Sequence, residues 1–379
     1  MVLCRRILRL LAGLLLGLGA GVALRPAASA GAAPPPLVRL IAASATDPAI
    51  DDVNGVHHVA IGAAGSRRGR LLVFLPGTTA SAQMYSFLIE RAATLGYHAI
   101  GLAYVNDVAV NVLCAGMGAS GCHEAVRREV LLGTDESELV QVDADNGVFH
   151  RLERLLDHLA AIAPQEGWAS YRDGQGAVRW HRVVVSGHSQ GAGHAAFLGR
   201  LQRVARAVLF SGTEPAPWTQ AADFATPALD FYGFAHRLEP IYDPIQRSWD
   251  NIGIPGAPIS VDAALPPFGG SQQLHTSSED CTGDPQSNGF YHNCHCADDW
   301  MPFLPDGTPA FQVVWDHLFD VPGVPALPAA SPAPRAIGLG LIAAAGLWLG
   351  RGRPRRRPGP GGSPGQADGH ARDQTSARP

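Results

Sequence analysis

The chain has 379 residues, of which 46% are hydrophobic and 16% are charged, and its formal net charge is -4. This length and hydrophobic content are ample for a large folded core. Because the net charge is negative and no basic stripe interleaved with aromatic residues runs through the body of the chain, the composition argues against a nucleic-acid partner.

The N-terminus is typical of a signal peptide. Residues 10–24 form an apolar stretch, and residues 28–30 (Ala-Ser-Ala) match a small-residue cleavage site. The basic residues that precede the apolar stretch are Arg5, Arg6 and Arg9. We therefore expect residues 1–30 to direct export, with an uncleaved signal anchor as the alternative, and residues 31–36 to form a linker.

The body of the chain, residues 37–322, is predicted to be one domain in which strand-like and helix-like segments alternate. The expected strands are 56–61, 70–75, 98–104, one that begins at 183, 205–210 and 228–232. The expected helices are 81–95, 148–162, 190–201 and a closing helix at 311–318. Strands that alternate with helices predict an α/β fold, with a mostly parallel sheet and helices on both faces.

The C-terminal part is predicted to carry a second topological signal. Residues 323–335 form a linker rich in proline and alanine, residues 336–350 are apolar, and residues 351–379 are basic at first and then polar. Fifteen apolar residues are short for a hydrocarbon core of about 30 Å. An apolar run followed by a basic cluster resembles the sorting tails of exported bacterial proteins, so we expect contact with a membrane or a processing enzyme. A disordered tail that anchors nothing is the alternative.

The most informative motif is Gly-x-Ser-x-Gly at 187–191, with Ser189 at its centre. The pattern alone is weak, since it recurs at 361–365 in a segment rich in proline and glycine. At Ser189, however, a β-branched run at 183–185 precedes the motif and small residues follow it, as a strand, a sharp turn and a helix require. We predict that Ser189 is a nucleophile on a strained strand-to-helix turn; an ordinary glycine-rich turn is the alternative.

A serine hydroxyl needs a base within hydrogen-bond reach, and that base needs an acid to orient it. The acid is expected in the turn after the 228–232 strand, where Glu239 is the first choice and Asp243 lies slightly further on. Glu214, which follows the preceding strand, is another alternative.

The base is expected in a loop beyond the last core strand, and we predict His292 for this role. His295 and His275 are the alternatives. His188 and His194 lie too close to Ser189 in sequence to act as its base, so we expect them to be packing residues.

The remaining requirement is an oxyanion hole with two backbone N–H donors. One donor is predicted to be Gln190, which follows the nucleophile. The other is predicted to be Thr78 or Thr79, in the Pro-Gly-Thr-Thr loop after the 70–75 strand. An ordinary strand-to-helix turn is the alternative interpretation of that loop.

Five cysteines remain after removal of the signal peptide, and export places them where disulfides form. Cys114 with Cys122 would close a short loop, and Cys281 has either Cys294 or Cys296 as its partner. The His- and Cys-rich segment 292–299 lacks the ligand spacing of common zinc sites, so we expect neither a metal nor a cofactor.

The elbow octapeptide 187–194 (Gly-His-Ser-Gln-Gly-Ala-Gly-His), the Cys-to-Cys loop 114–122, the helix 151–160 and the pair Gly167-Trp168 carry a resemblance. Over about residues 71–318 the chain resembles exported bacterial serine hydrolases of the α/β-hydrolase superfamily, which includes esterases and lipases.

This resemblance implies an α/β-hydrolase fold with Ser189 as nucleophile, and the His-Asn-x-x-x-x-Asp stretch at 292–298 favours His292, with Asp298 beyond it. The chain departs from the superfamily at Glu239, where Asp is more common. The expected activity is hydrolysis of a small-molecule or lipid carboxylic ester outside the cytoplasm. The alternatives are acyl transfer or peptide hydrolysis by the same residues, and a surface binding module without catalysis.

Overall fold

The computed structural model describes residues 34–52, 54–117 and 121–324. The predicted signal peptide, the start of the linker at 31–36, and everything from residue 325 onward lie outside the described residues. Within the described ranges, no helix is both long and apolar enough to cross a membrane. The apolar stretch predicted at 336–350 is not part of those ranges.

The described residues form one sheet of nine strands in the order β1-β2-β4-β3-β5-β6-β7-β9-β8. The pairs β1–β2 and β2–β4 are antiparallel. All the other neighbouring pairs in this order are parallel. The strands are β1 (Leu37–Ile41), β2 (His57–Ile61), β3 (Leu71–Leu75), β4 (His98–Gly101), β5 (Val183–His188), β6 (Arg206–Phe210), β7 (Phe231–His236), β8 (Ile259–Ser260) and β9 (Gln273–Thr276). The predicted α/β class with a mostly parallel sheet is therefore confirmed.

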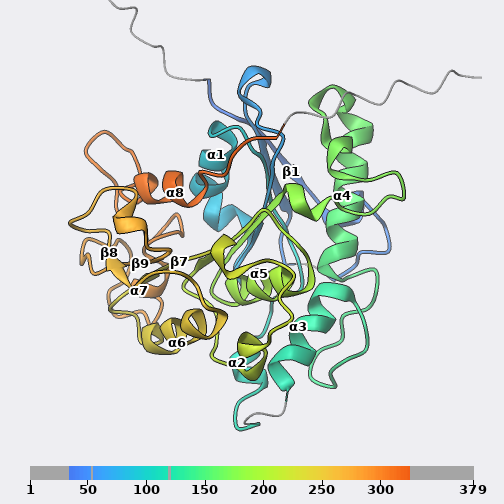
Figure 1. Ribbon diagram of the computed structural model, residues 1–379. Coiled ribbons are helices and arrows are strands. Elements are labelled where there is room, and N and C mark those ends of the chain that lie inside the picture. The colour runs from blue at the N-terminus through green and yellow to red at the C-terminus, as the bar shows by residue number, and fades with distance from the viewer. Residues whose placement is uncertain (1–33, 53, 118–120, 325–379) are drawn as a thin grey trace, which may run out of the picture. The chain divides into compact units, whose positions relative to one another are not determined.

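Helices cover both faces of the sheet (Figure 1). They are α1 (Ser86–Thr94), α2 (Val110–Leu113), α3 (Cys122–Leu132), α4 (Val148–Ile162), α5 (Gln190–Leu201), α6 (Tyr242–Ile252), α7 (Phe290–Asn293) and α8 (Gln312–Leu318). The central strand β3 shows how the two layers arise. Leu71, Val73 and Leu75 pack with α4 and α5, whereas Leu72 and Phe74 pack with α1 and α8. Successive side chains of a strand point to opposite faces, so an entirely apolar strand serves two cores at once.

Several predicted elements need correction. The segment 228–232 is not a strand throughout, because 228–230 form a 3-10 turn and β7 begins at Phe231 and runs to His236. The predicted helix 81–95 begins as a 3-10 turn and becomes α-helical only at Ser86. The strand expected at 98–104 ends at Gly101. The strands β1, β8 and β9 and the helices α2, α3, α6 and α7 were not predicted.

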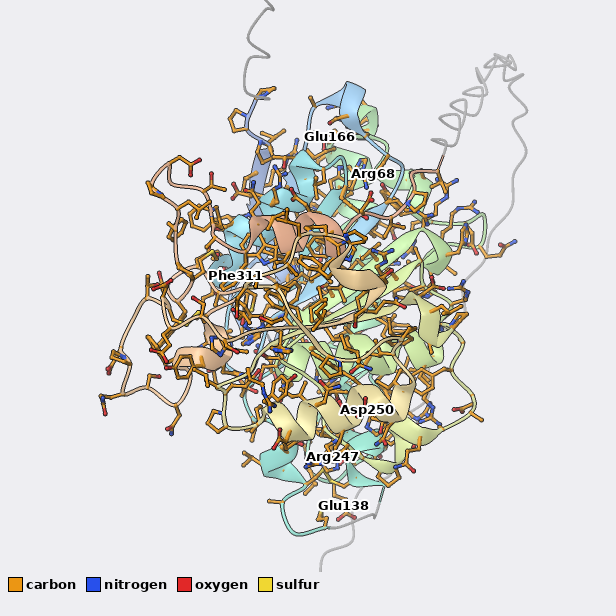
Figure 2. The ribbon with its side chains drawn as sticks, turned by 60° about the vertical axis from the view of Figure 1, so that its left-hand side comes forward. Arg68, Glu138, Glu166, Arg247, Asp250 and Phe311 are labelled. Carbon is orange, nitrogen blue, oxygen red and sulfur yellow. A yellow bond between two sulfur atoms is a disulfide. The ribbon has the colours of Figure 1, made fainter. Side chains whose placement is uncertain are left out.

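The folded body continues to the last described residue. The Arg68 guanidinium donates to the carbonyl oxygen of Val321 at 3.1 Å, and the Val324 N–H donates to the carbonyl oxygen of Arg68 at 2.8 Å. Arg68 lies close to the point at which the described chain ends (Figure 2). Ordered contacts therefore extend two residues into the segment 323–335 that was predicted to be a linker.

Candidate active site

Ser189 sits on a sharp turn between β5 and α5, with φ of 55° and ψ of -121°. A non-glycine residue at positive φ is uncommon and costs energy, so the surrounding structure must hold it there. The Ser189 N–H donates to the carbonyl oxygen of Phe210 at 2.8 Å, which ties the turn to β6. A Cβ on Gly191 would lie 2.0 Å from the carbonyl oxygen of Leu75, so only glycine lets α5 approach β3 this closely. The predicted elbow geometry is therefore present.

Glu239 and His292 meet beside this elbow. The Glu239 carboxylate lies in the turn after β7, and its Oε2 is 2.5 Å from Nδ1 of His292. The side chain of Glu239 is inaccessible to solvent, whereas that of His292 is 16% exposed. A buried carboxylate that binds Nδ1 fixes the tautomer and the orientation of the ring and leaves Nε2 for a reacting group.

His188, the residue before Ser189 in the chain, contacts this pair. Its Nε2 donates to the backbone carbonyl oxygen of His292 at 2.9 Å, and the two ring centroids are 4.6 Å apart. Its Nδ1 accepts from the hydroxyl of Tyr85 at 2.9 Å. Burial holds the pKa of His188 well below its usual range, so this ring is neutral. His188 therefore acts as a fixed spacer between His292 and the elbow, in agreement with the packing role expected for it.

The two predicted oxyanion donors converge on the same turn. Gln190 is the first residue of α5, where helix N–H groups have no partner within the helix. The N–H of Thr79 donates to the carbonyl oxygen of Asn106 at 2.9 Å, so it is already engaged. The N–H of Thr78 has no acceptor among the described residues, and its hydroxyl lies 3.2 Å from Oε1 of Gln190. The geometry therefore favours Thr78 over Thr79.

Asn106 is the residue that shapes this loop, and sequence reasoning missed it. Its Nδ2 donates to the carbonyl oxygens of Gly77 at 2.5 Å and Ala80 at 3.0 Å. A single buried amide thus satisfies the carbonyl oxygens of Gly77 and Ala80, which flank the two threonines of this loop. Nothing in the local sequence around Asn106 signals this role, because the two segments are far apart in the chain.

The alternative acids lie elsewhere. Glu214 is buried in an ion pair with Arg127, and it also accepts hydrogen bonds from Thr213 at 2.8 Å and Trp218 at 3.0 Å. Burial alone would raise the pKa of Glu214, but Arg127, together with the Thr213 hydroxyl, more than offsets it and the pKa is lowered. Asp243 is exposed beside Arg237. Neither carboxylate contacts a histidine of the predicted triad.

The alternative histidines are also placed away from the elbow turn or behind it. His275 lies on β9, with Nδ1 3.4 Å from the hydroxyl of Tyr242. His194, which was expected to be a packing residue, is buried within α5, and neither of its ring nitrogens has a hydrogen-bond partner in the described structure. His295 is fully buried, with Nε2 3.1 Å from Oγ of Ser211. Of the predicted histidines, His292 is the one that the structure pairs with a carboxylate at the elbow.

Asp298, which the resemblance placed beyond His292, caps a helix. Its carboxylate accepts from the N–H and the hydroxyl of Ser86, at 2.9 and 2.5 Å, at the start of α1. Burial raises the pKa of Asp298 to about 6. This carboxylate therefore orients α1 and does not take part in the cluster around His292.

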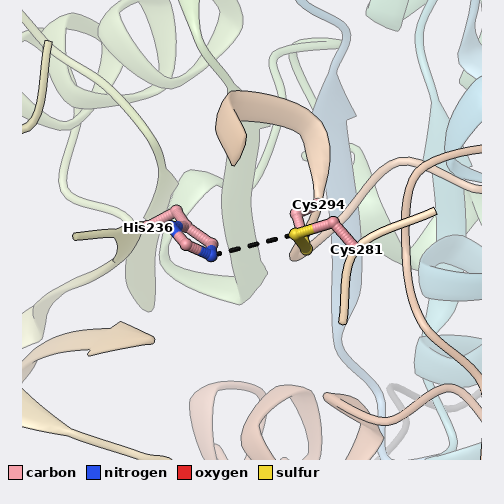
Figure 3. Close-up of side chains that lie close together, drawn as sticks. All are labelled: His236, Cys281 and Cys294. Atoms are coloured by element: carbon pink, nitrogen blue, oxygen red, sulfur yellow. Dashed lines mark hydrogen bonds between the residues drawn. A yellow bond between two sulfur atoms is a disulfide. The ribbon is translucent and has the colours of Figure 1, made fainter. Parts of the chain in front are cut away.

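Two disulfides, Cys114–Cys122 and Cys281–Cys294, fix the flanking loops, and Cys296 is a free, buried thiol. The second disulfide ties down the segment that carries His292. Figure 3 shows His236 beside this bond, with Nε2 3.8 Å from Sγ of Cys281. Histidine and cysteine can bind a metal, but these two cysteines are joined in a disulfide. The cluster therefore holds two segments of the chain together. Disulfides are typical of an oxidising, extracytoplasmic environment.

A hollow of about 750 Å³ lies beside α8 and next to the loop that carries Cys281. Its walls include Asp262, Glu279 and Phe311, and Phe311 is labelled in Figure 2. None of Ser189, Glu239 or His292 lines it. The hollow therefore lies apart from the polar groups that gather at the elbow.

No protein-family model matches this chain, and no curated protein matches it in sequence. The function is accordingly inferred from the arrangement of its own residues.

Proposed function

We propose that this protein is an α/β-hydrolase that cleaves carboxylic esters with Ser189, His292 and Glu239. The observation that carries the proposal is the bond between His292 and a fully buried Glu239 beside a strained serine turn. The chain order of serine, then acid, then histidine, on a parallel sheet, is that of this superfamily. The two disulfides support a place of action outside the cytoplasm.

In the proposed reaction, Oγ of Ser189 attacks the acyl carbon while Nε2 of His292 removes the hydroxyl proton. The carbonyl π electrons move to oxygen, and the N–H groups of Gln190 and Thr78 stabilise the resulting oxyanion. When the tetrahedral species collapses, the alcohol departs with the proton that His292 returns. Water then repeats the sequence on the acyl-serine and releases the carboxylic acid. Glu239 stabilises the imidazolium at each stage without taking its proton.

The decisive variant is Ser189→Ala. It should lower turnover of p-nitrophenyl esters by about 10⁴-fold or more, because the nucleophile is lost. Ser186→Ala is the matched control: Ser186 lies three residues earlier, and its hydroxyl donates to the carbonyl oxygen of Val208 at 2.9 Å. The control should retain turnover within a few fold. Equal turnover by wild type and Ser189→Ala would refute the proposal.

A fluorophosphonate probe distinguishes an enzyme from a binding module on the same fold. Such a probe should label wild type at Ser189 and should label neither Ser189→Ala nor His292→Gln. If the wild type is not labelled, the protein is a binding module. Product analysis with an added alcohol or a peptide substrate separates hydrolysis from acyl transfer and from peptidase activity.

A further inference from the structure

A second histidine lies behind the proposed triad and is connected to its acid. Nε2 of His295 is 3.1 Å from Oγ of Ser211, and Oγ of Ser211 is 2.6 Å from Oε1 of Glu239. The other carboxylate oxygen of Glu239 binds His292. His295 and Ser211 are both buried, at 0% and 1% exposure, so water does not compete for these bonds.

The direction of each hydrogen bond follows from the number of protons. Ser211 has one hydroxyl proton, which it donates to the carboxylate of Glu239. Nε2 of His295 must therefore carry a proton and donate it to Oγ of Ser211. Burial holds the pKa of His295 well below its usual range, so the ring is neutral; its Nδ1 has no hydrogen-bond partner among the described residues. The result is a chain of two hydrogen bonds, which we call the relay: His295 donates to Ser211, and Ser211 donates to Glu239.

The carboxylate of Glu239 is thus fixed from two sides. Oε1 accepts from Ser211 and from the backbone N–H of His236 at 3.1 Å, while Oε2 faces His292. Ser211 adopts a φ of 44°, which is costly for a non-glycine residue. Its N–H donates to the carbonyl oxygen of Phe234 at 3.0 Å, which joins the end of β6 to β7. Strain of this kind persists only where the surrounding structure holds the residue in place.

Other titratable groups near Glu239 do not serve the same purpose. Burial raises the pKa of the Cys296 thiol, which stays neutral. The ring of His236 donates through Nε2 to the carbonyl oxygen of Ser278 at 2.8 Å, away from Glu239. The hydroxyl of Tyr242, on α6, donates to Gln246 at 3.2 Å. Among the described residues, only Ser211, His236 and His292 donate to the carboxylate.

We infer that Ser211 and His295 are positioning residues that turn the Glu239 carboxylate toward His292 for the proposed hydrolysis. The effect on catalysis rests on the proposed function. The positioning of Glu239 rests on the hydrogen bonds alone. Neither residue touches the substrate; both act through Glu239.

The kinetic test compares Ser211→Ala with wild type. Loss of a hydrogen bond to a charged group should lower kcat by about 10- to 100-fold, with KM changed by less than about twofold. A Glu239 carboxylate that is no longer turned toward His292 should stabilise the protonated ring less, so the acidic limb of kcat/KM should move to lower pH. Ser248→Ala is the matched control, because Ser248 is equally buried and donates to the carbonyl oxygen of Ile245 at 2.6 Å. Loss of kcat without movement of the limb, or equal loss in the control, overturns the inference.

Two variants of His295 test the far end of the relay. His295→Leu removes the donor to Ser211 and should lower kcat in the same way as Ser211→Ala. His295→Gln keeps an N–H donor and should recover part of that loss. If the Gln and Leu variants lose kcat to the same extent, a packing role for the ring explains the result and the relay is wrong.

A spectroscopic test does not depend on catalysis and so separates this inference from the proposed function. The proton on Nδ1 of His292 should give a strongly downfield ¹H resonance, because it lies in a short bond to a carboxylate. That resonance should be absent in His292→Gln and should shift in Ser211→Ala and His295→Leu, but not in Ser248→Ala. If the resonance is unshifted in folded Ser211→Ala and His295→Leu, the inference is overturned, even when the enzyme is active. A shift would uphold the positioning of His292 even if no ester is hydrolysed.

Discussion

Two buried glutamates stand at the same edge of the sheet, in the loops that follow the adjacent strands β6 and β7. Glu214 and Glu239 are 6% and 3% exposed, so burial does not distinguish them. Their partners do. Glu214 lies against the guanidinium of Arg127, with Thr213 and Trp218 as further donors. Glu239 receives hydrogen bonds from a hydroxyl, a backbone N–H and an imidazole.

This difference in partners separates a structural carboxylate from one that is suited to catalysis. A guanidinium keeps its proton at every pH that proteins encounter, so the Arg127–Glu214 pair is a permanent buried ion pair. An imidazole can accept and release a proton near neutral pH, so the charge opposite Glu239 can change during a reaction. A search for buried acids would find both glutamates, and only the group opposite each one assigns its role.

The strongest test of this contrast is Glu239→Gln. The amide would impose the wrong tautomer on His292, and kcat should fall by about 10⁴-fold, as happens when the acid of a serine triad becomes its amide. The free energy of unfolding should change little, because the amide oxygen can still accept from Ser211 and His236. Steady-state ester hydrolysis and urea unfolding measure the two effects, with Glu214→Gln as the matched control. A variant that unfolds more readily but hydrolyses at the wild-type rate per folded molecule would reverse the assignment.

The second test is Glu214→Gln itself. It leaves the buried charge of Arg127 without a counter-ion, which should lower the free energy of unfolding by about 3–5 kcal/mol. The activity per folded molecule should stay within a few fold of wild type. Chemical denaturation monitored by tryptophan fluorescence gives the stability, and Glu239→Gln is the reciprocal control. A stability within about 1 kcal/mol of wild type would mean that the ion pair does not hold this region together.

The smallest expected effect is on the pH dependence of stability. The pKa of Glu214 is lowered in the folded protein from an ordinary value of 4.5, so its contribution is present above about pH 4.5 and is lost as the pH falls through the folded value. The stability difference between wild type and Glu214→Gln should therefore be largest above pH 4.5 and should shrink below it. Urea unfolding at several pH values measures this difference. A difference that stays constant down to the acid transition would contradict the ion-pair explanation.

Local sequence was sufficient where the chain's own covalent neighbours set the structure. The apolar run of β3 and the apolar stripe of α4 predicted those elements closely, because their periodicity encodes burial directly. The elbow at Ser189 was predicted equally well, because its glycines allow close approaches within the same turn and to β3. By contrast, the prediction placed β7 too early, with a strand at 228–232 and a turn directly after it. In the fold, Gly233 lies within the strand, where a Cβ would stand 2.5 Å from the Trp249 ring.

The sequence by itself therefore determined the fold class, the turn that holds Ser189 and the set of candidate partners for it. Only the tertiary structure decided that Glu239 and His292 meet, that Thr79 is already engaged, and that Ser211 and His295 lie behind the acid. Glu239 is 53 residues from His292 and 28 residues from Ser211 along the chain. Hydrogen bonds over such separations depend on the order of strands in the sheet and on the closure of loops, neither of which is written in the spacing of residues along the chain.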